Sequence, residues 1–579
     1  MNTRTRARMA VSATVTAGLC LAGTAALATP SSAGSSAATG TCDTAYPVAD
    51  LTAGQAVNGL TVTQGTTPST FTGSVIGVLQ DGIEPGVDMV MAKLSSPEIQ
   101  ENGIWEGMSG SPVYDQTTGE LIGAVAYTLS WGATQVAGIT PWQDMQAYAA
   151  QAAPVHVKVS SAAARAIARA SSVTATQASQ GFAEVATPHL VSGLPQRILD
   201  RARRSGHGHR YLTKGVSAAG QTGTVTVADM VAGGNLVATA STGDIVQAGL
   251  GTITSVCNDR VVGFGHPMNF VGKTTYGMAG ASALYIQGDP LGSSFKVANL
   301  GGVLGTIDQD RMTGISGSLG GTPRSTPVTS TITYSPQNGA KRSRVGSSQV
   351  QQPDAAAATT FYEQVANHQA VLDAYQAGSE AQTWIVRGHT SAGPFRFTGG
   401  NRYTDTFDIA SASSWDLADL VYLLTSIHGV TVDSVDVHSS VSDDTTMLKI
   451  TGLQQWRHGA WRHVGKGHPA QVKAGHLLKM RLVFGGGVKG KKFTVAVPKQ
   501  AAGMRGSLSA FPAEGYPFEQ SFPHQLSGVR KLVDTMQRND QARIEFSAFG
   551  DTNGIVKTSS TAPARKVIEG HAAVRVRIS

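Results

Sequence analysis

Short apolar runs separated by glycine-rich turns dominate two parts of the chain, residues 71–148 and 243–317. Runs of this length, bounded by Gly, Pro, Asn and Asp, predict β-strands joined by tight turns. Residues 253–264 predict a hairpin that turns at Asn258 and Asp259. We therefore expect a mainly β fold in which two strand-rich halves carry most of the architecture.

Helical periodicity is limited to short segments. The predicted helices are residues 160–172, 194–201, 354–378, 413–427 and 526–537. Residues 326–350 predict one strand and a polar tail. Strands predicted at 446–453, 476–484 and 493–498 favour an immunoglobulin-like sandwich, and a strand at 541–548 is followed by a weak tail. The sequence contains no convincing internal repeat.

Length and composition indicate several regions. The 579 residues are too many for one core, and 68 glycines with only 14% charged residues favour turn-rich β structure. The predicted regions are a signal peptide (1–33), a first β-rich half (34–155), an alanine-rich and basic insertion (156–237), a second β-rich half (238–335), an α+β region (336–445) and a basic, sandwich-like C-terminal region (446–579).

The first 33 residues have the pattern of a secretory signal. Arg4, Arg6 and Arg8 precede an apolar stretch that ends at Ala26-Leu27-Ala28, which is a plausible cleavage site. No other apolar run is long enough to span a bilayer. We therefore expect a protein that is secreted, extracellular or cell-wall associated, with no transmembrane segment in the mature chain.

Removal of the signal leaves two cysteines. Cys20 is lost with it, and Cys42 and Cys257 remain. In an oxidising compartment two cysteines predict one disulfide, the alternative being two unpaired buried thiols.

The charge is distributed unevenly. The net charge is +7, but residues 445–513 contain no acidic residue and include twelve Lys or Arg, with Trp456 and Trp461 among them. Outside a cell such a region could bind an anionic cell-wall polymer or membrane headgroups, and the compartment argues against nucleic acid. The alternative is a solvated basic face.

His207 and His209 lie in a basic linker, and a metal pair there would need further ligands, so no metal or cofactor is expected.

The segment Gly107-Met108-Ser109-Gly110-Ser111-Pro112 carries the most specific chemical signal. Its glycines allow positive φ and leave backbone N–H groups uncovered around Ser109. A nucleophilic serine needs an exposed Oγ and amides that hold an oxyanion, here those of Gly107 and Ser109. An ordinary glycine-rich turn is the alternative reading.

The flanks of this segment indicate its context. A nucleophile elbow runs from a strand into a helix, whereas Pro112 here leads into another strand, which suits a chymotrypsin-like β-barrel loop. Met108 stands where the trypsin-type motif has aspartate, so pairing with a freed amino terminus is not expected.

A serine nucleophile needs a base, and His266 is the best placed of fifteen histidines. It follows an apolar strand and lies between Gly265 and Pro267, where the backbone is constrained and the ring can be aimed. A purely structural histidine is the alternative.

Three segments together resemble the SpoIVB-type serine peptidases. They are GMSGSP at 107–112 followed by LIGAV at 121–125, the glycine-rich segments 251–253 and 263–266 that end in His266, and residues 304–317. The resemblance implies an endopeptidase that acts on proteins or peptides, with Ser109 as nucleophile and His266 as general base. Members of this family can also cut themselves.

The chain departs from the family pattern in three ways. The serine segment precedes the histidine segment, as in a broader group of secreted bacterial relatives, and no PDZ-like module precedes the β-rich halves. Ser96 stands before Pro97 where the family has aspartate. The third triad member is therefore open: Asp310 lies in a matched segment, Asp259 and Asp88 are alternatives, and a Ser–His dyad is a further one.

The sequence thus predicts a mainly β chain with a chymotrypsin-like β-barrel-type peptidase unit, an inserted helical linker, and α+β and sandwich-like regions after it. The expected function is a secreted serine endopeptidase, with self-processing possible. The alternatives are a non-catalytic extracellular or cell-wall-binding protein on a peptidase scaffold, and an esterase that uses the same serine.

Overall fold

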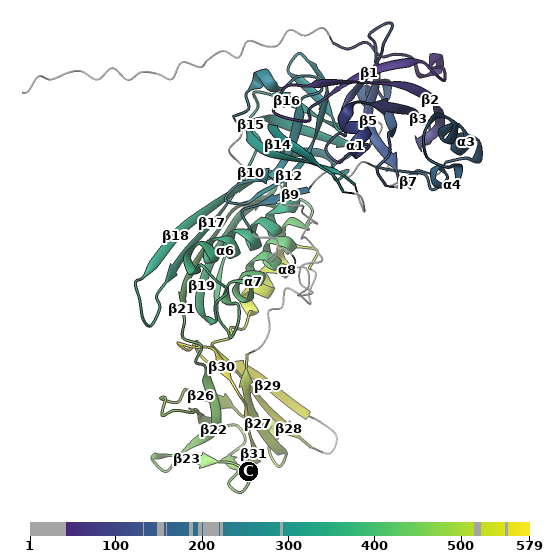
Figure 1. Ribbon diagram of the computed structural model, residues 1–579. Helices are drawn as coiled ribbons and strands as arrows, with labels where there is room; N and C mark the ends of the chain where they lie inside the picture. Colours follow the sequence, from purple (N-terminus) through teal and green to yellow (C-terminus); the bar gives the residue numbers. More distant parts are fainter. Residues whose placement is uncertain are drawn as a thin grey trace, which may run out of the picture. The chain divides into compact units, whose positions relative to one another are not determined.

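The computed structural model (Figure 1) describes residues 42–130, 132–147, 156–157, 159–184, 189–194, 200, 219–220, 224–289, 293–513, 523–550 and 554–579. The chain is mainly β, with 51% strand and 17% helix, as the sequence predicts. The predicted signal peptide, most of the predicted helix 194–201 and the His207–His209 pair lie outside the described residues.

A closed barrel of six antiparallel strands forms the first part. Its strands are β1 (Ala56–Thr61), β2 (Ser69–Glu84), β3 (Val87–Ser95), β4 (Pro112–Asp115), β5 (Leu121–Leu129) and β6 (Val136–Pro141). They pair in the order β1–β2–β3–β6–β5–β4, and β4 closes the barrel on β1. Trp105 and Phe71 are fully buried in its core. Helices α1 (Pro97–Asn102) and α2 (Trp142–Ala147) flank it.

Six later strands form a second closed ring with the same order. They are β11 (Asn235–Gly243), β12 (Val246–Cys257), β13 (Arg260–Gly263), β14 (Gly272–Gln287), β15 (Phe295–Arg311) and β16 (Gly314–Leu319). They pair as β11–β12–β13–β16–β15–β14, all antiparallel, and β14 returns to β11. Asn258 and Asp259 both have positive φ (48° and 62°), so the β12–β13 hairpin turns where the sequence predicts. The repetition is one of topology, since the sequence shows no repeat.

The segment between the rings adds strands to both. It contains β7 (His156–Val157), α3 (Ser161–Ala170), α4 (Ala175–Ala178), β8 (Phe182–Glu184), β9 (His189–Ser192) and β10 (Ala219–Gly220). β8 pairs with β5 of the first barrel, whereas β9 and β10 pair with β12 and β15 of the second ring. The helix predicted at 160–172 is α3, and Ser160 caps its first turn.

A disulfide joins Cys42 to Cys257, whose Cα atoms are 4.9 Å apart, as the sequence predicts. The next residue reinforces this link: Ser255 Oγ donates to the Asp43 carboxylate at 2.5 Å, and Trp142 Nε1 donates to the Asp43 carbonyl at 3.3 Å. The start of the described chain is therefore held by both rings.

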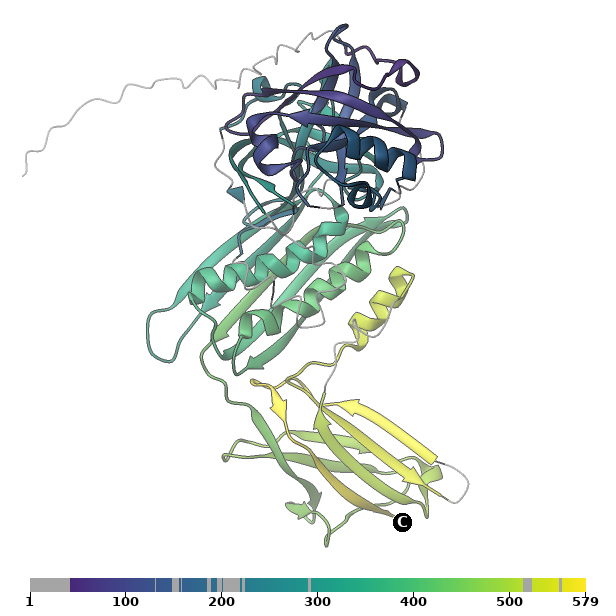
Figure 2. The ribbon, with the colours of Figure 1, turned by 45° about the vertical axis from the view of Figure 1, so that its right-hand side comes forward.

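The α+β part extends the second ring. Its strands are β17 (Thr326–Tyr334), β18 (Arg342–Val350), β19 (Gly378–Thr390), β20 (Gly393–Asp405) and β21 (Thr431–Ser442), ordered β20–β19–β21–β17–β18, and β18 pairs with the end of β11. Helices α6 (Ala356–Leu372) and α7 (Ile409–Thr425) lie side by side on one face of this sheet (Figures 1 and 2).

The predicted polar tail within 326–350 is wrong, because residues 342–350 form β18. Its inward positions include Gly346 and Ser348, and the Ser348 hydroxyl donates to the buried Glu363 carboxylate. Small or polar residues at inward positions remove the apolar alternation that marks a strand.

The C-terminal part contains two sheets whose buried faces share one hydrophobic cluster. One has β22 (Leu448–Arg457), β23 (Ala460–Val464), β25 (Leu477–Phe484), β26 (Lys492–Ala496) and β30 (Ile568–Glu569). The other has β24 (Ala470–Val472), β27 (Arg505–Pro512), β28 (Ala542–Phe549), β29 (Gly554–Ser560) and β31 (Ala572–Ile578). The weak tail predicted after 548 is wrong, since β29 and β31 pair with β28 and β27. α8 (Leu526–Thr535) is the helix predicted at 526–537 and buries Val529 in the cluster of the α+β part.

Four short 3₁₀ turns complete the described structure: η1 (Val48–Asp50), η2 (Val227–Asp229), η3 (Pro353–Ala355) and η4 (Lys499–Ala501).

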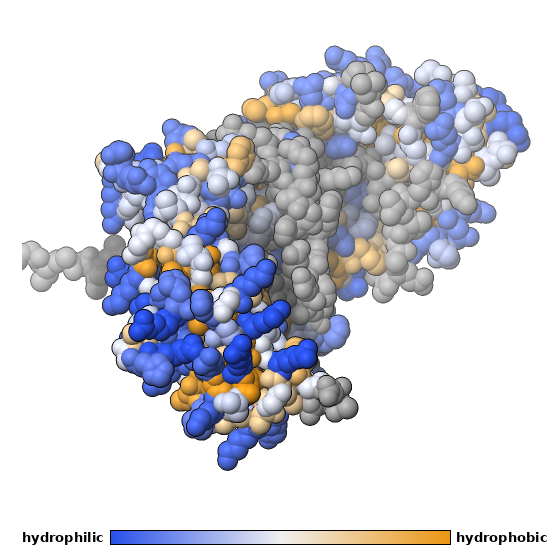
Figure 3. Space-filling view, turned by 90° about the horizontal axis from the view of Figure 1, so that it is seen from below, coloured by the Kyte–Doolittle hydropathy of each residue, from blue (hydrophilic) through white to orange (hydrophobic). Residues whose placement is uncertain are grey.

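The face in Figure 3 is mostly hydrophilic, with apolar patches between polar side chains. Among the described residues, no helix is long and apolar enough to cross a membrane.

The second ring contains a buried lysine that makes its stability depend on pH. Lys296 on β15 is fully buried and donates to Asn235 Oδ1 at 2.7 Å, and burial lowers its pKa to about 7. Between pH 7 and 10 the unfolded chain therefore holds a proton that the folded chain lacks. Stability then rises with pH by up to about 1.4 kcal/mol per unit.

We predict that Lys296→Met flattens this pH dependence and raises stability at pH 7. Denaturant unfolding at pH 7, 8 and 9 measures both effects. Parallel pH profiles for the two proteins would contradict the expected burial of an amine.

Candidate functional site

The loop that carries Ser109 leaves two backbone amides unused. It lies between α1 and β4, and Gly107 and Gly110 take positive φ (92° and 96°). Each of the neighbouring N–H groups donates to a backbone carbonyl; these donors are the N–H groups of Glu106, Met108, Gly110 and Ser111. Within the described part of the chain, the N–H groups of Gly107 and Ser109 have no hydrogen-bond partner. Two such donors beside a serine are the chemistry that an oxyanion needs.

The same loop is fixed on the second ring by three hydrogen bonds. The Ser109 carbonyl accepts from the Thr252 N–H at 2.7 Å. The Thr252 hydroxyl donates to the Gly107 carbonyl at 3.0 Å, and the Thr254 hydroxyl donates to the Gly110 carbonyl at 2.8 Å. Strand β12 thus holds the backbone on both sides of Ser109.

His266 lies on a constrained loop that contacts the first barrel in return. It follows β13, and the two residues before it, Phe264 and Gly265, have φ of 70° and 73°. Positive φ at a buried phenylalanine is costly and is found where the surrounding structure requires it. The Thr140 hydroxyl of β6 donates to the Gly265 carbonyl at 2.6 Å. A Cβ on Gly265 would lie 3.1 Å from that of Ala124 on β5.

The hydrogen bond of His266 fixes its tautomer. Nδ1 lies 2.8 Å from the Pro267 carbonyl, and a carbonyl oxygen can only accept. The neutral ring therefore carries its proton on Nδ1 and a lone pair on Nε2, which is the form that can act as a base.

Asp310 holds the loop that follows His266. It lies near the end of β15, just before the β15–β16 hairpin, and accepts the N–H groups of Met268 and Asn269 at 2.8 and 2.9 Å. Burial raises the pKa of this carboxyl, while hydrogen bonds from the amides of residues 268–271 oppose the rise. The contacts assign Asp310 as a positioning residue for the histidine loop.

The other predicted acidic positions have local roles. Asp259 forms the β12–β13 turn, and Asp88 accepts the Asp81 N–H in the β2–β3 hairpin. Ser96 caps α1 by accepting the Ile99 N–H at 3.2 Å, a task that aspartate also performs at helix N-termini.

Ser109 is closed off in this structure. The residue is fully buried, and its Oγ has no hydrogen-bond partner among the described residues, so no hydrogen bond joins it to His266. Catalytic hydrogen bonds are often long before substrate binds. A substrate could therefore reach Ser109 Oγ only after a change in the surrounding structure.

Strand β8 occupies the edge of β5 next to the loop that carries Ser109. β4 pairs with β5 at residues 121–124, the loop exchanges hydrogen bonds with Val125, and β8 pairs antiparallel with Tyr127–Leu129. The Ser130 N–H also donates to the Gly181 carbonyl at 3.0 Å. Phe182 anchors β8 because its side chain is fully buried in the cluster that includes Tyr127.

Several residues that hold the loops of Ser109 and His266 could not be predicted from sequence motifs. The Pro267 carbonyl, Thr140 and the threonines of β12 act through backbone contacts. Glu106 and Lys296 also meet here through their backbones, and burial, with Asp289 nearby, raises the pKa of Glu106 to about 7. The local signals for these were the segment Gly263-Phe264-Gly265, whose last two residues have positive φ, and the Gly251-Thr252 step.

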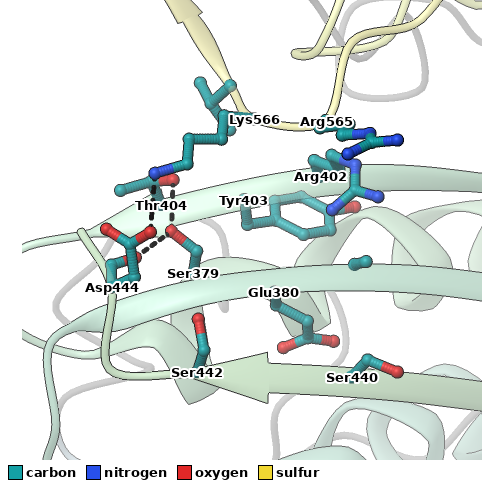
Figure 4. A pocket seen from close by; sticks show the side chains of 12 residues that line it. Ser379, Glu380, Arg402, Tyr403, Thr404, Ser440, Ser442, Asp444, Arg565 and Lys566 are labelled. Carbon is teal, nitrogen blue, oxygen red and sulfur yellow. Dashed lines mark hydrogen bonds and ion pairs between the residues drawn. The ribbon is translucent and has the colours of Figure 1, made fainter. Parts of the chain in front are cut away.

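Other polar clusters lie outside this site. A cavity of about 110 Å³ is lined by groups that include Ser379, Arg402 and Lys566, and Lys566 forms an ion pair with Asp444 at 2.6 Å (Figure 4). Figure 4 shows Glu380 pointing away from Lys566, and its carboxylate meets His368 at 2.8 Å in the interior.

Burial works against the charged form of His368, but the Glu380 carboxylate outweighs it, so the pKa of His368 is raised. Within the described residues, no group of three or more His, Cys, Asp or Glu could hold a metal ion.

Comparison with family models, curated proteins and solved structures finds no match for this chain.

The closeness of the two rings gives a prediction about Gly110. A Cβ at this position would lie 1.9 Å from the Thr252 carbonyl oxygen and 2.5 Å from the Phe264 nitrogen. We expect Gly110→Ala to cost about 3 kcal/mol of unfolding free energy because backbone atoms must move.

Gly119→Ala is the matched control, since Gly119 also has positive φ (76°) but open space around it. It should cost only about 1 kcal/mol. Equal losses in denaturant unfolding would show that the loop is not held against β12.

Proposed function

We propose that this chain is a serine endopeptidase of the SpoIVB type that acts outside the cell, with Ser109 as nucleophile and His266 as general base. The observation that carries the proposal is the pair of unused N–H groups at Gly107 and Ser109 beside a hydroxyl without a partner. A structural turn has no reason to keep both donors unsatisfied, because buried N–H groups are normally paired.

In this mechanism the His266 Nε2 accepts the proton of Ser109 Oγ as Oγ attacks the peptide carbonyl carbon. The oxyanion is held by the N–H groups of Gly107 and Ser109. His266 then gives its proton to the leaving amine, and water activated by the same Nε2 hydrolyses the acyl-enzyme. The Pro267 carbonyl keeps Nδ1 protonated throughout, and Asp310 holds the histidine loop.

The topology supports a chymotrypsin-like unit. Ser109 follows the third strand of its ring, His266 follows the third strand of the other, and Asp310 precedes the last strand of the second ring. Because Thr252 and Ser109 join the rings directly, chain order does not decide which groups meet. A serine-first order is thus compatible with the same site.

The proposed substrate is an extended polypeptide that pairs with β5 at Tyr127–Leu129. Strand addition at a sheet edge supplies main-chain hydrogen bonds without a demand on sequence. β8 holds that edge here, so the described structure corresponds to a latent form. Displacement of β8 would open the site, and this segment is where self-processing would act.

Ser109→Ala and His266→Ala should each abolish cleavage of an unfolded protein such as casein, by at least about 10³-fold for a working nucleophile–base pair. Two controls are matched by residue type. Ser426 is exposed at the end of α7, where its hydroxyl donates to the Tyr422 carbonyl, and His389 is exposed beside Asp433. Ser426→Ala and His389→Ala should therefore keep activity. Cleavage that survives in Ser109→Ala would overturn the assignment.

A reversible cross-link tests the latent form. Thr128 and Ala183 lie directly opposite each other in β5 and β8, so a Thr128→Cys/Ala183→Cys pair can form a disulfide. We expect the oxidised double variant to be inactive and reductant to restore cleavage. Wild-type protein with and without reductant controls for the native disulfide. Equal activity of the oxidised and reduced forms would show that β8 does not block the site.

A second candidate is a non-catalytic binding protein on this scaffold. It is favoured by the buried Oγ and by the absence of a Ser109–His266 hydrogen bond. A folded protein with no cleavage in any variant, the reduced cross-linked form included, would select this candidate.

A further inference from the structure

One face of the sheet β23–β22–β25–β26 carries side chains that serve no packing role. The other face is buried through residues such as Leu453, Met480 and Leu482. Because side chains alternate along a strand, the residues between them point outward. The register then places Trp456 opposite Trp461, and Gln454 opposite both His463 and Arg481.

Contacts between these groups order the face. Gln454 Oε1 accepts from Arg481 Nε at 2.9 Å, and its amide donates to His463 Nε2 at 3.0 Å. The Arg481 guanidinium lies 4.8 Å from the centre of the Trp461 ring, and that ring is 5.2 Å from Trp456. A polar row across three strands thus runs beside an aromatic pair.

The positive charges on this face lack an anionic partner among the described residues. Arg481 and Lys492 lie directly opposite each other, and like charges in that position destabilise a sheet. Among the described residues, no ion pair is formed by Arg481, by Lys492 or by the exposed Lys479. Residues 445–513 contain no acidic side chain that could supply one. An anion from outside would relieve this repulsion.

We propose that this face binds the chain of an anionic glycan. Trp456 is 41% exposed and offers an aromatic surface on which a sugar ring can stack. Lys479, Arg481 and Lys492 would pair with its carboxylate or phosphate groups. A face on which cations lie beside an aromatic pair suits a polymer that lies along it. The site is independent of Ser109, so it stands whether or not the chain is a peptidase.

The test uses the full-length protein without its signal and polygalacturonate as the probe, followed by tryptophan fluorescence. Trp456→Ala should weaken binding about tenfold. Lys479→Gln and Lys492→Gln should each weaken it several-fold and reduce its dependence on salt. Lys557→Gln changes the same charge at an exposed position on β29 of the other sheet and should leave binding unchanged.

Poly-L-glutamate and vesicles of phosphatidylglycerol distinguish the alternatives. Equal affinity for poly-L-glutamate, with no effect of Trp456→Ala, would overturn the proposal in favour of unspecific charge attraction. Preference for the vesicles would overturn it in favour of a membrane surface. No binding to polygalacturonate would overturn it outright, and thermal unfolding verifies that each variant is folded.

Discussion

The hydrogen bond between the Thr252 N–H and the Ser109 carbonyl is the contact on which the proposed site depends. It lies between two hydroxyl contacts from the same strand, so the backbone of the glycine loop is held from one side over four residues. The loop can then leave the amides of Gly107 and Ser109 unused without collapsing into an ordinary turn. On the other side, Thr140 fixes Gly265 and thereby aims the histidine loop back at the first barrel. Neither ring alone would place both groups.

The proposed latent form rests on the same geometry. Beside the loop of Ser109, β4 pairs with β5 only as far as Ala124, and a strand edge beyond such a point can accept another strand. β8 takes that place through three residues and one buried phenylalanine. This pairing joins three residue pairs, against eight between β2 and β3, and so short a pairing is suited to exchange. The aromatic and cationic face of the C-terminal part would meanwhile keep the protein near an anionic glycan, where an extended substrate could be met.

Local chemistry determined which features were predictable from the sequence. The hairpin at Asn258 and Asp259, the Cys42–Cys257 pair and the glycine loop around Ser109 depend on residue types that permit few alternatives. Ring closure could not be predicted, because it depends on pairings between strands distant in the chain, such as β11 with β14. β18 was missed because its inward positions are Gly346 and Ser348, and the role of Pro267 because a backbone carbonyl leaves no trace in a motif. Asp310 could be selected from the sequence because it lies in a segment that resembles the peptidase family. Its contacts with the Met268 and Asn269 N–H groups could not be predicted, because the fold brings these residues together.

The most direct test of the central claim is to identify by mass spectrometry the residue that a fluorophosphonate modifies in the purified mature protein. We expect a single adduct on Ser109, formed faster when β8 is displaced and absent in His266→Ala. An adduct on another serine, or modification of Ser109 at the same rate without His266, would contradict the proposed nucleophile–base pair.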